Sequence, residues 1–224
     1  MSRSRIVVLG LALGRSTVGK KAVSAASGLV LCGYVLVHML ANLQIFAERA
    51  RIDAYARSLR ASPVLLWSVR ALLVAAFAAH VVVALQLSAR RRRARPTSYR
   101  CGAPRGPGRA ERAMLASGVV LALFVVLHLA NLTWGILHPH FVRLAVHDNV
   151  VALFRVAPWS AVYVVAIAAL ALHVAHGAWS ALQSLGLTPE RGAPGLRRLA
   201  LGAAITVAAG LLAVIIAVVS GGLR

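Results

Sequence analysis

Acidic residues are the scarcest charged groups in this chain of 224 residues, which has five Asp and Glu against 25 Lys and Arg. Charged residues of both signs make up only 13% of the chain, whereas 60% of it is hydrophobic. A soluble domain is usually about 45–50% apolar. The shortage of charge therefore argues against an ordinary soluble domain and indicates an integral membrane protein.

Cysteine is also rare, with only Cys32 and Cys101, and no CxxC or Cys/His ligand spacing is present. A disulfide framework is therefore not expected. The net charge of +20 could suggest nucleic acid, but the densest basic patch, residues 90–112, lacks the series of aromatic residues that a stacking surface needs. We interpret this patch as a cytoplasmic loop that sets topology and attracts anionic lipid, with no nucleic-acid partner.

What the chain has in abundance is long apolar runs. Five can be drawn, each of about 20 residues or more, which is enough to cross a hydrocarbon core of about 30 Å as a helix. We predict an all-α integral membrane protein whose helices form a bundle, with expected spans at 22–45, 63–89, 113–137, 158–184 and 199–220. A cytoplasmic N-terminal segment, 1–21, precedes them, and the stretch 46–62 resembles an amphipathic surface helix.

Basic residues are distributed unevenly between the two sides of these spans. One side holds 17 of the Lys and Arg residues and the other holds 7. The positive-inside rule then predicts a cytoplasmic N-terminus and an outer C-terminus.

Two of the spans contain a repeated phrase. SGLVLCGYVLVHMLANL at 27–43 resembles SGVVLALFVVLHLANL at 117–132, and in both a glycine lies ten residues before a histidine. Ionisable residues inside membrane helices are costly and usually functional. Five of the eight histidines lie inside spans, and the fifth span has none: His38, His80, His128, His173 and His176.

Depth along the helices sorts these histidines into two layers. At a rise of about 1.5 Å per residue, His38 and His128 fall in an outer layer and His80 and His173 in an inner layer, about 8 Å apart. Two facing imidazoles can hold a six-coordinate haem iron between helices. Zinc fits less well because it needs four close ligands, and a proton relay would normally include Asp or Glu. His176 competes with His173, although depth favours His173.

Arg70 lies seven residues into the second span, with no carboxylate at its depth. Snorkelling to the outer surface is one reading. The other is pairing with a propionate of the outer haem.

The phrases RSTVGKK at 15–21, SGLVLCGYVLVHMLANLQIF at 27–46 and LHVAHGAWSALQSLGL at 172–187 resemble the cytochrome b subunit of succinate dehydrogenases and fumarate reductases. The resemblance is to the single-chain, five-helix, two-haem membrane anchor, in a form similar to that of actinobacteria. It covers about residues 15–220. It implies two b haems, with His38 and His128 as axial ligands of the outer one and His80 and His173 of the inner one.

The same resemblance implies a place in complex II of the respiratory chain. Flavoprotein and iron–sulfur subunits would dock on the cytoplasmic face of a bacterial plasma membrane, and electrons would pass to quinone, expected to be menaquinone. The chain has no flavin or iron–sulfur motif, so it would not oxidise succinate alone, and we expect no catalytic residue in it. Some relatives have a carboxylate near the outer start of the second helix, where this chain reads ASPVLLW with no acid, although Glu48 and Asp53 are nearby in sequence. Separately, Ser27 and Lys21, near the inner face, are candidates for an inner quinone site.

Two alternatives stay open. One is the cytochrome b anchor of another respiratory oxidoreductase, such as a nitrate reductase or hydrogenase. The other is a haem-free membrane transporter or scaffold.

Overall fold

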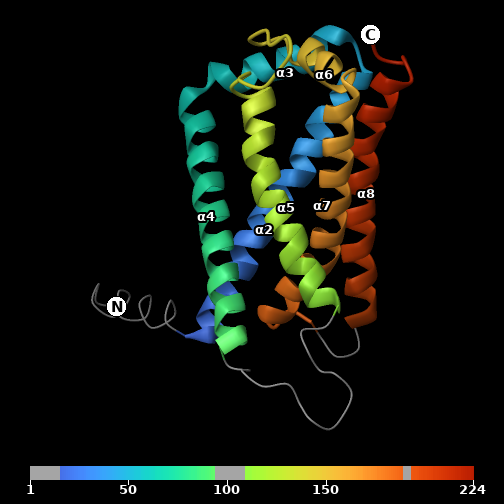
Figure 1. The fold of residues 1–224 in the computed structure, drawn as a ribbon. Coiled ribbons are helices and arrows are strands. Elements are labelled where there is room, and N and C mark those ends of the chain that lie inside the picture. Colours follow the sequence, from blue (N-terminus) through green and yellow to red (C-terminus); the bar gives the residue numbers. More distant parts are fainter. Residues whose placement is uncertain (1–15, 94–108, 189–192) are drawn as a thin grey trace.

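The fold is all helical in the computed structural model, which describes residues 16–93, 109–188 and 193–224 (Figure 1). No strand occurs in these ranges. The elements in chain order are α2 (Thr17–Asn42), the 3₁₀ helix η1 (Leu43–Phe46), α3 (Arg49–Ala61), α4 (Pro63–Arg93), α5 (Arg109–Leu132), α6 (Val146–Phe154), α7 (Ala157–Ser184) and α8 (Ala193–Val219).

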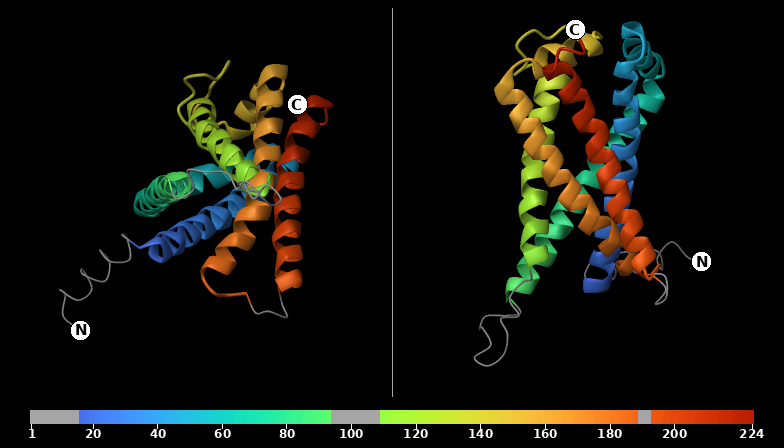
Figure 2. Two further views of the ribbon diagram at one scale, coloured as in Figure 1. Left: turned by 60° about the horizontal axis from the view of Figure 1, so that its bottom comes forward. Right: turned by 90° about the vertical axis from the view of Figure 1, so that its right-hand side faces the viewer.

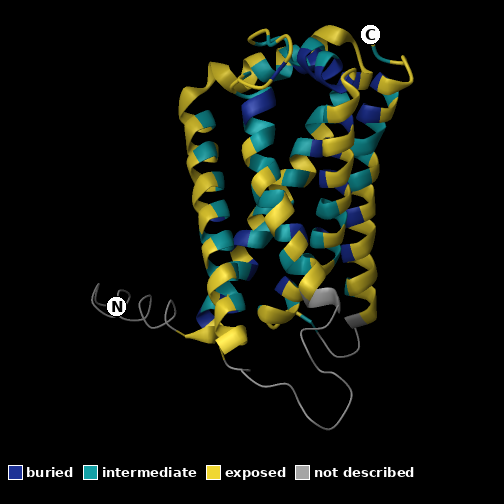
Figure 3. Cartoon of the chain, viewed as in Figure 1, coloured by how far each residue is buried: buried dark blue, intermediate teal, exposed yellow. Residues whose placement is uncertain are grey.

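Five of these helices are long and apolar enough to cross a membrane: α2 with η1, α4, α5, α7 and α8. Many large apolar side chains along them are exposed, and the yellow ribbon in Figure 3 runs along the outer surfaces of the long helices. Such a surface is stable when lipid covers it, because apolar side chains in contact with lipid tails do not carry the free-energy cost of exposure to water. The prediction of a five-helix, multi-pass membrane protein is confirmed.

The helix boundaries differ from the predicted spans for local reasons. The first helix starts at Thr17, because the Ser16 hydroxyl accepts a hydrogen bond from the Gly19 amide (2.9 Å) and caps it. Helix α5, the third of the membrane spans, ends at Leu132 and does not continue to 137 as predicted. The chain then turns through Gly135, whose φ of 71° suits a residue without a side chain. The last helix starts at Ala193 and carries two arginines in its second turn.

The long helices pack around a central pair, α2 and α7. Helix α2 packs against α4 and α7, α5 packs against α7, and α8 packs against α7 (Figure 2). The helices α4 and α5 share few contacts with each other. The central pair, α2 and α7, therefore lies between the helices that carry the other two candidate ligands.

Short helices cover one end of the bundle, which we call the capped end: α3, η1 and α6, with the C-terminus beside them (Figure 1). The other end, which we call the basic end, contains the starts of α2, α5 and α8 and the ends of α4 and α7. Residues 1–15 and 94–108, which include most of the predicted N-terminal segment and basic loop, lie outside the described residues.

The largest buried core lies at the capped end, around α6 (Figure 3). It joins η1, α3, α6, α7 and α8 through eleven buried side chains: Ile45, Ile52, Val150, Val151, Leu153, Phe154, Tyr163, Ile167, Val214, Ile215 and Val218. The predicted surface helix at 46–62 is present as α3, whereas α6 was not predicted. Both helices bury one side against the bundle.

Polar contacts attach these short helices to each other. Arg49 on α3 forms an ion pair with Asp148 on α6 (2.5 Å), and the His147 amide donates to the Asp53 carboxylate (3.0 Å). The His147 imidazole also bonds Asp148, and this hydrogen bond, with Arg49, holds the pKa of the Asp148 carboxyl below its usual value.

The connection before α6 has its own polar anchor. Asn149 bonds both backbone groups of Val142, and His138 Nε2 bonds the Asn149 carbonyl (2.8 Å). A histidine of this loop thus has a structural partner.

Candidate functional site

His38 on α2 and His128 on α5 meet in the half of the bundle nearer the capped end. Their ring centroids are 5.7 Å apart, with an angle of 89° between the ring planes. The two residues are 90 positions apart in the sequence and occupy equivalent places in the repeated phrase. The structure therefore brings together the two histidines assigned to the outer layer.

His80 on α4 and His173 on α7 form a second pair. Their ring centroids are 6.1 Å apart, with an interplanar angle of 74°. The contacts of these rings are with Ser24, Ser27 and Ser117, in the first half of α2 and α5, nearer the basic end than His38 and His128. The structure thus also brings together the two histidines assigned to the inner layer.

The backbone of α2 sets the proton position on His80. Its Nδ1 lies 3.0 Å from the Ser24 carbonyl oxygen and 3.4 Å from the Ser27 hydroxyl. A carbonyl only accepts hydrogen bonds, so Nδ1 must carry the proton, and in a neutral imidazole Nε2 then presents a lone pair. A histidine that ligates a metal usually donates its other ring N–H in this way.

His173 has the matching arrangement on α5. Its Nδ1 lies 3.2 Å from the Ser117 hydroxyl, which donates to the Met114 carbonyl (3.1 Å). Because the hydroxyl proton is directed to that carbonyl, the hydroxyl oxygen accepts from Nδ1–H of His173. Both inner imidazoles are therefore held with Nε2 free of any hydrogen bond to the described residues.

A glycine follows each of these serines and lets the ring approach the helix. A Cβ built on Gly28 would lie 3.0 Å from His80 Cε1, and one built on Gly118 would lie 3.2 Å from His173 Cε1. Both distances are shorter than an ordinary van der Waals contact. The Ser-Gly step of the repeat thus provides a seat for an imidazole of a neighbouring helix, on α2 for α4 and on α5 for α7.

The outer pair has aromatic neighbours. Tyr163 on α7 places its hydroxyl 3.3 Å from His128 Nδ1, and Phe124 packs near the same imidazole with a centroid distance of 5.7 Å. Tyr34 stacks on His38 at 5.6 Å. These rings surround the pair with apolar surface and leave Tyr163 as its polar contact.

Asn131 lies near this group and is fully buried. Its amide is close to the Tyr163 hydroxyl, but neither amide atom reaches hydrogen-bond geometry with any described residue. A buried amide without partners is costly, so this side chain marks a polar position beside the outer pair that protein atoms alone do not satisfy.

Each imidazole pair could hold one metal ion, such as the iron of a haem. Metal–imidazole nitrogen bonds of about 2 Å place the centroids of two rings on opposite sides of one metal about 6 Å apart, and the observed separations are 5.7 and 6.1 Å. No cluster of three or more His, Cys, Asp or Glu occurs in the part of the chain that the structure describes.

His176 is separated from the pairs, although it lies only three residues after His173. It lines a cavity with Ala175, Trp179 and Arg197, between α7 and α8. His173 faces Ser117 and His80 instead. The rotation of α7 thus distinguishes two histidines between which the sequence supplied only a preference, by depth, for His173.

Arg70 packs over the Trp67 ring, with Cζ 5.0 Å from its centroid, and makes no ion pair with a described carboxylate.

Of the two candidates for a quinone site, Ser27 donates its hydroxyl to the Val23 carbonyl (2.7 Å) and lies beside His80. Lys20, the neighbour of Lys21, bonds Gln86 on α4.

Sequence reasoning missed the contacts around the imidazoles. Ser27 and Ser117 contact the inner pair, and Tyr163 contacts His128. A signal for the serines was available, because the Ser-Gly dipeptide opens both copies of the repeat. Nothing comparable marks Tyr163.

Comparison with known proteins identifies no relative: no family model, no curated protein and no solved structure matches the chain. The class of protein defined by the fold is a five-helix, multi-pass membrane protein with two histidine pairs between its helices.

Proposed function

We propose that this chain is the haem-carrying membrane anchor of a succinate:quinone oxidoreductase. The observation that carries the proposal is the two imidazole pairs, each drawn from two helices at its own depth. The backbone and serine contacts of the inner pair support it further, because they leave Nε2 available for a metal.

His38 and His128 would hold an outer b haem, and His80 and His173 an inner one. Bound haem would supply one-electron transfer across the apolar bundle, between an iron–sulfur subunit and quinone. The chain's own residues would orient the imidazoles, pack Phe124 and Tyr34 against them, and offer Arg70 as a partner for a propionate.

The rest of the complex is proposed from charge and resemblance. The basic end would face the cytoplasm of a bacterium and receive the flavoprotein and iron–sulfur subunits. Menaquinone is the quinone we propose. The protein itself would carry electrons and would not act on succinate alone.

The direct test is the absorption spectrum of the full chain purified in mild detergent. We expect a low-spin b-type spectrum and about two haems per chain by pyridine haemochrome assay. Colourless protein that also fails to bind added haem would overturn the proposal.

Two variants test the pairing itself. His128→Ala should leave about one haem per chain and remove the outer component from a redox titration, whereas His80→Ala should remove the inner one. Equal loss of both haems from either folded variant would contradict two separate sites. His176→Ala is the matched control, because His176 faces a different cavity, and should keep both haems.

A reduction assay distinguishes this complex from other respiratory enzymes. Membranes that contain the chain with its co-purifying subunits should reduce the haems when succinate is added. Reduction by hydrogen, or oxidation by nitrate, without a response to succinate or fumarate would favour the anchor of another oxidoreductase.

A further inference from the structure

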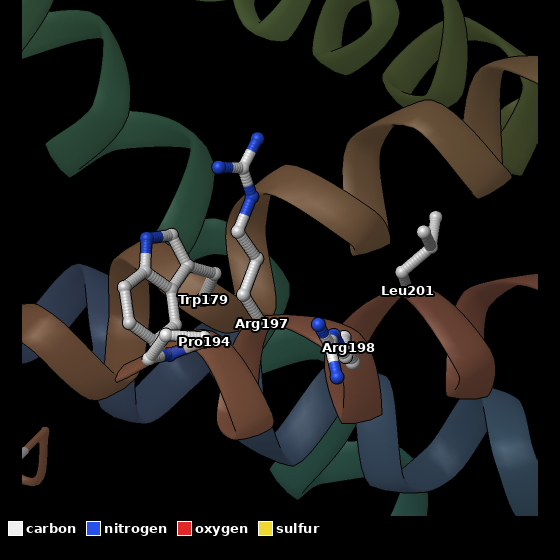
Figure 4. A pocket seen from close by; sticks show the side chains of 5 residues that line it. All are labelled: Trp179, Pro194, Arg197, Arg198 and Leu201. Atoms are coloured by element: carbon white, nitrogen blue, oxygen red, sulfur yellow. The ribbon is translucent and has the colours of Figure 1, made fainter. Parts of the chain in front are cut away.

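A second site lies at the basic end, away from the histidine pairs. A cavity of about 540 Å³ is lined by Trp179 of α7 and by four residues at the start of α8: Pro194, Arg197, Arg198 and Leu201 (Figure 4). The smaller cavity beside His176, of about 230 Å³, shares Trp179 and Arg197 with it. The two cavities therefore form one groove where α7 and α8 meet, which we call the α7–α8 groove.

The groove presents hydrogen-bond donors and positive charge. Arg197 and Arg198 are exposed, and neither makes an ion pair or hydrogen bond with any described residue. The Trp179 indole can only donate. Neither α7 nor α8 contains an Asp or Glu. An anion with several acceptor oxygens would match these exposed donors in charge and hydrogen bonding.

The depth of the groove indicates where this anion comes from. Arg197 is the fourth residue of the candidate span Pro194–Val219, so it lies at the level where the hydrocarbon core meets the headgroups. Tryptophan is typical of this level. Beyond the arginines the groove is lined by Leu201, whose side chain is apolar and 50% exposed.

Size supports an amphiphile over a bare ion. A cavity of about 540 Å³ is within the range of about 300–1,000 Å³ that holds organic ligands. One water molecule occupies about 30 Å³ of liquid. A phosphate, which has only five heavy atoms, would therefore fill only part of this cavity. A phosphate at the arginines, with its glycerol in the cavity and acyl chains along Leu201, would use both parts of the groove.

We propose that the α7–α8 groove binds the phosphate headgroup of an anionic phospholipid. Arg197 and Arg198 contact the phosphate oxygens, Trp179 donates its indole N–H, and the acyl chains follow the apolar surface of α8. This site is independent of the proposed electron-transfer function, since none of its residues belongs to the histidine pairs.

Binding is tested on the full chain in neutral detergent by native mass spectrometry with phosphatidylglycerol and phosphatidylcholine. We expect a clear preference for phosphatidylglycerol. Arg197→Gln with Arg198→Gln should weaken that binding by about tenfold or more, the effect of losing at least one charge-assisted hydrogen bond. Trp179→Phe should weaken it by a smaller factor.

The matched control is Arg92→Gln with Arg93→Gln, which removes the same charge from the last turn of α4 at the same end. It should change the affinity less than twofold. Equal losses in the two double variants would show general electrostatic attraction and overturn the site, as would equal binding of the two lipids. Inorganic phosphate that displaces the lipid at comparable concentration would show a free-anion site and overturn the lipid assignment.

Discussion

At the scale of single residues, the notable feature is how the inner imidazoles are held. His80 and His173 each use Nδ1 for a contact to an oxygen of the neighbouring helix, and each keeps Nε2 free among the described residues. A contact of this kind orients the ring and raises the basicity of the free nitrogen. The serines therefore act through the histidines, as positioning residues.

Ser117→Ala should shift the midpoint potential of the proposed inner haem without removing the haem. The Ser117 hydroxyl accepts a hydrogen bond from Nδ1–H of His173. Without it the imidazole would be a weaker electron donor to iron, which favours the reduced state. A hydrogen bond of about 1 kcal/mol corresponds to about 40 mV for one electron, so we expect a rise of this order in the inner midpoint potential. Potentiometric titration measures it.

The equivalent change on α2 is Ser27→Ala, and its control is Ser24→Ala, one helical turn earlier. Ser27→Ala removes a hydroxyl beside His80, whereas Ser24→Ala removes a hydroxyl for which the structure shows no partner and keeps the carbonyl that His80 uses. We expect Ser24→Ala to leave both potentials unchanged. Unchanged potentials in Ser27→Ala and Ser117→Ala as well would exclude a positioning role for the serines.

At the scale of helices, close approach at two glycines decides where the rings lie. Helices α2 and α5 each present a glycine to an imidazole of their neighbour, at separations so short that an added methyl group would force the ring to move by a few tenths of an ångström. The short helices α3 and α6 act at the other end, where they bury apolar side chains against α7 and α8.

Gly28→Ala should displace the His80 ring, which cannot retreat easily because the Ser24 carbonyl holds it. If the two proposed haems are bound, the expected result is loss or an altered spectrum of the inner haem, with the outer haem retained. Gly33→Ala on the same helix meets nothing within 4 Å and should keep both haems. If the two variants have identical spectra, the Ser-Gly seat is not needed for haem binding.

The ion pair between α3 and α6 predicts a small, pH-dependent contribution to stability. The Asp148 pKa is lowered by its hydrogen bond from His147 and by Arg49, so the ionised form is favoured in the folded protein. This contribution is present above the usual carboxyl pKa of about 4 and is lost as the pH falls through the lower folded value.

Asp148→Asn should therefore lower the free energy of unfolding at pH 7 by about 0–1 kcal/mol, the value typical of an exposed ion pair. The melting temperature should fall slightly as a result. The difference from the parent protein should shrink below about pH 4. Thermal melts of the detergent-purified protein at pH 7, 5 and 3.5 measure this. A difference that grows towards low pH would contradict the assigned sign.

At the scale of the whole molecule, the two ends of the bundle differ in charge and in packing. The described acids with placed side chains, Glu48, Asp53 and Asp148, lie at the capped end, where Asp148 pairs with Arg49 and Asp53 accepts from the His147 amide. The basic end contains four arginines in the last turn of α4 and two near the start of α8. This asymmetry favours one orientation in the membrane.

Reporter fusions test that orientation. Alkaline phosphatase, which is active only outside the cytoplasm, should be active when inserted into the 133–145 connection and inactive in the 94–108 stretch. The opposite pattern would reverse the proposed topology and place the docking face for the partner subunits at the capped end.

The sequence alone determined the helical class and the number of spans, and it singled out the histidines that we propose as iron ligands, because apolar run length and the cost of a buried imidazole are local properties. It also predicted which histidines share a depth, since rise per residue is constant. Helix rotation and approach are set by packing, so only the tertiary structure decided that His176 turns away from His173. The same packing decided that Ser27 lies beside His80, and that Trp179 and Arg197 share a groove.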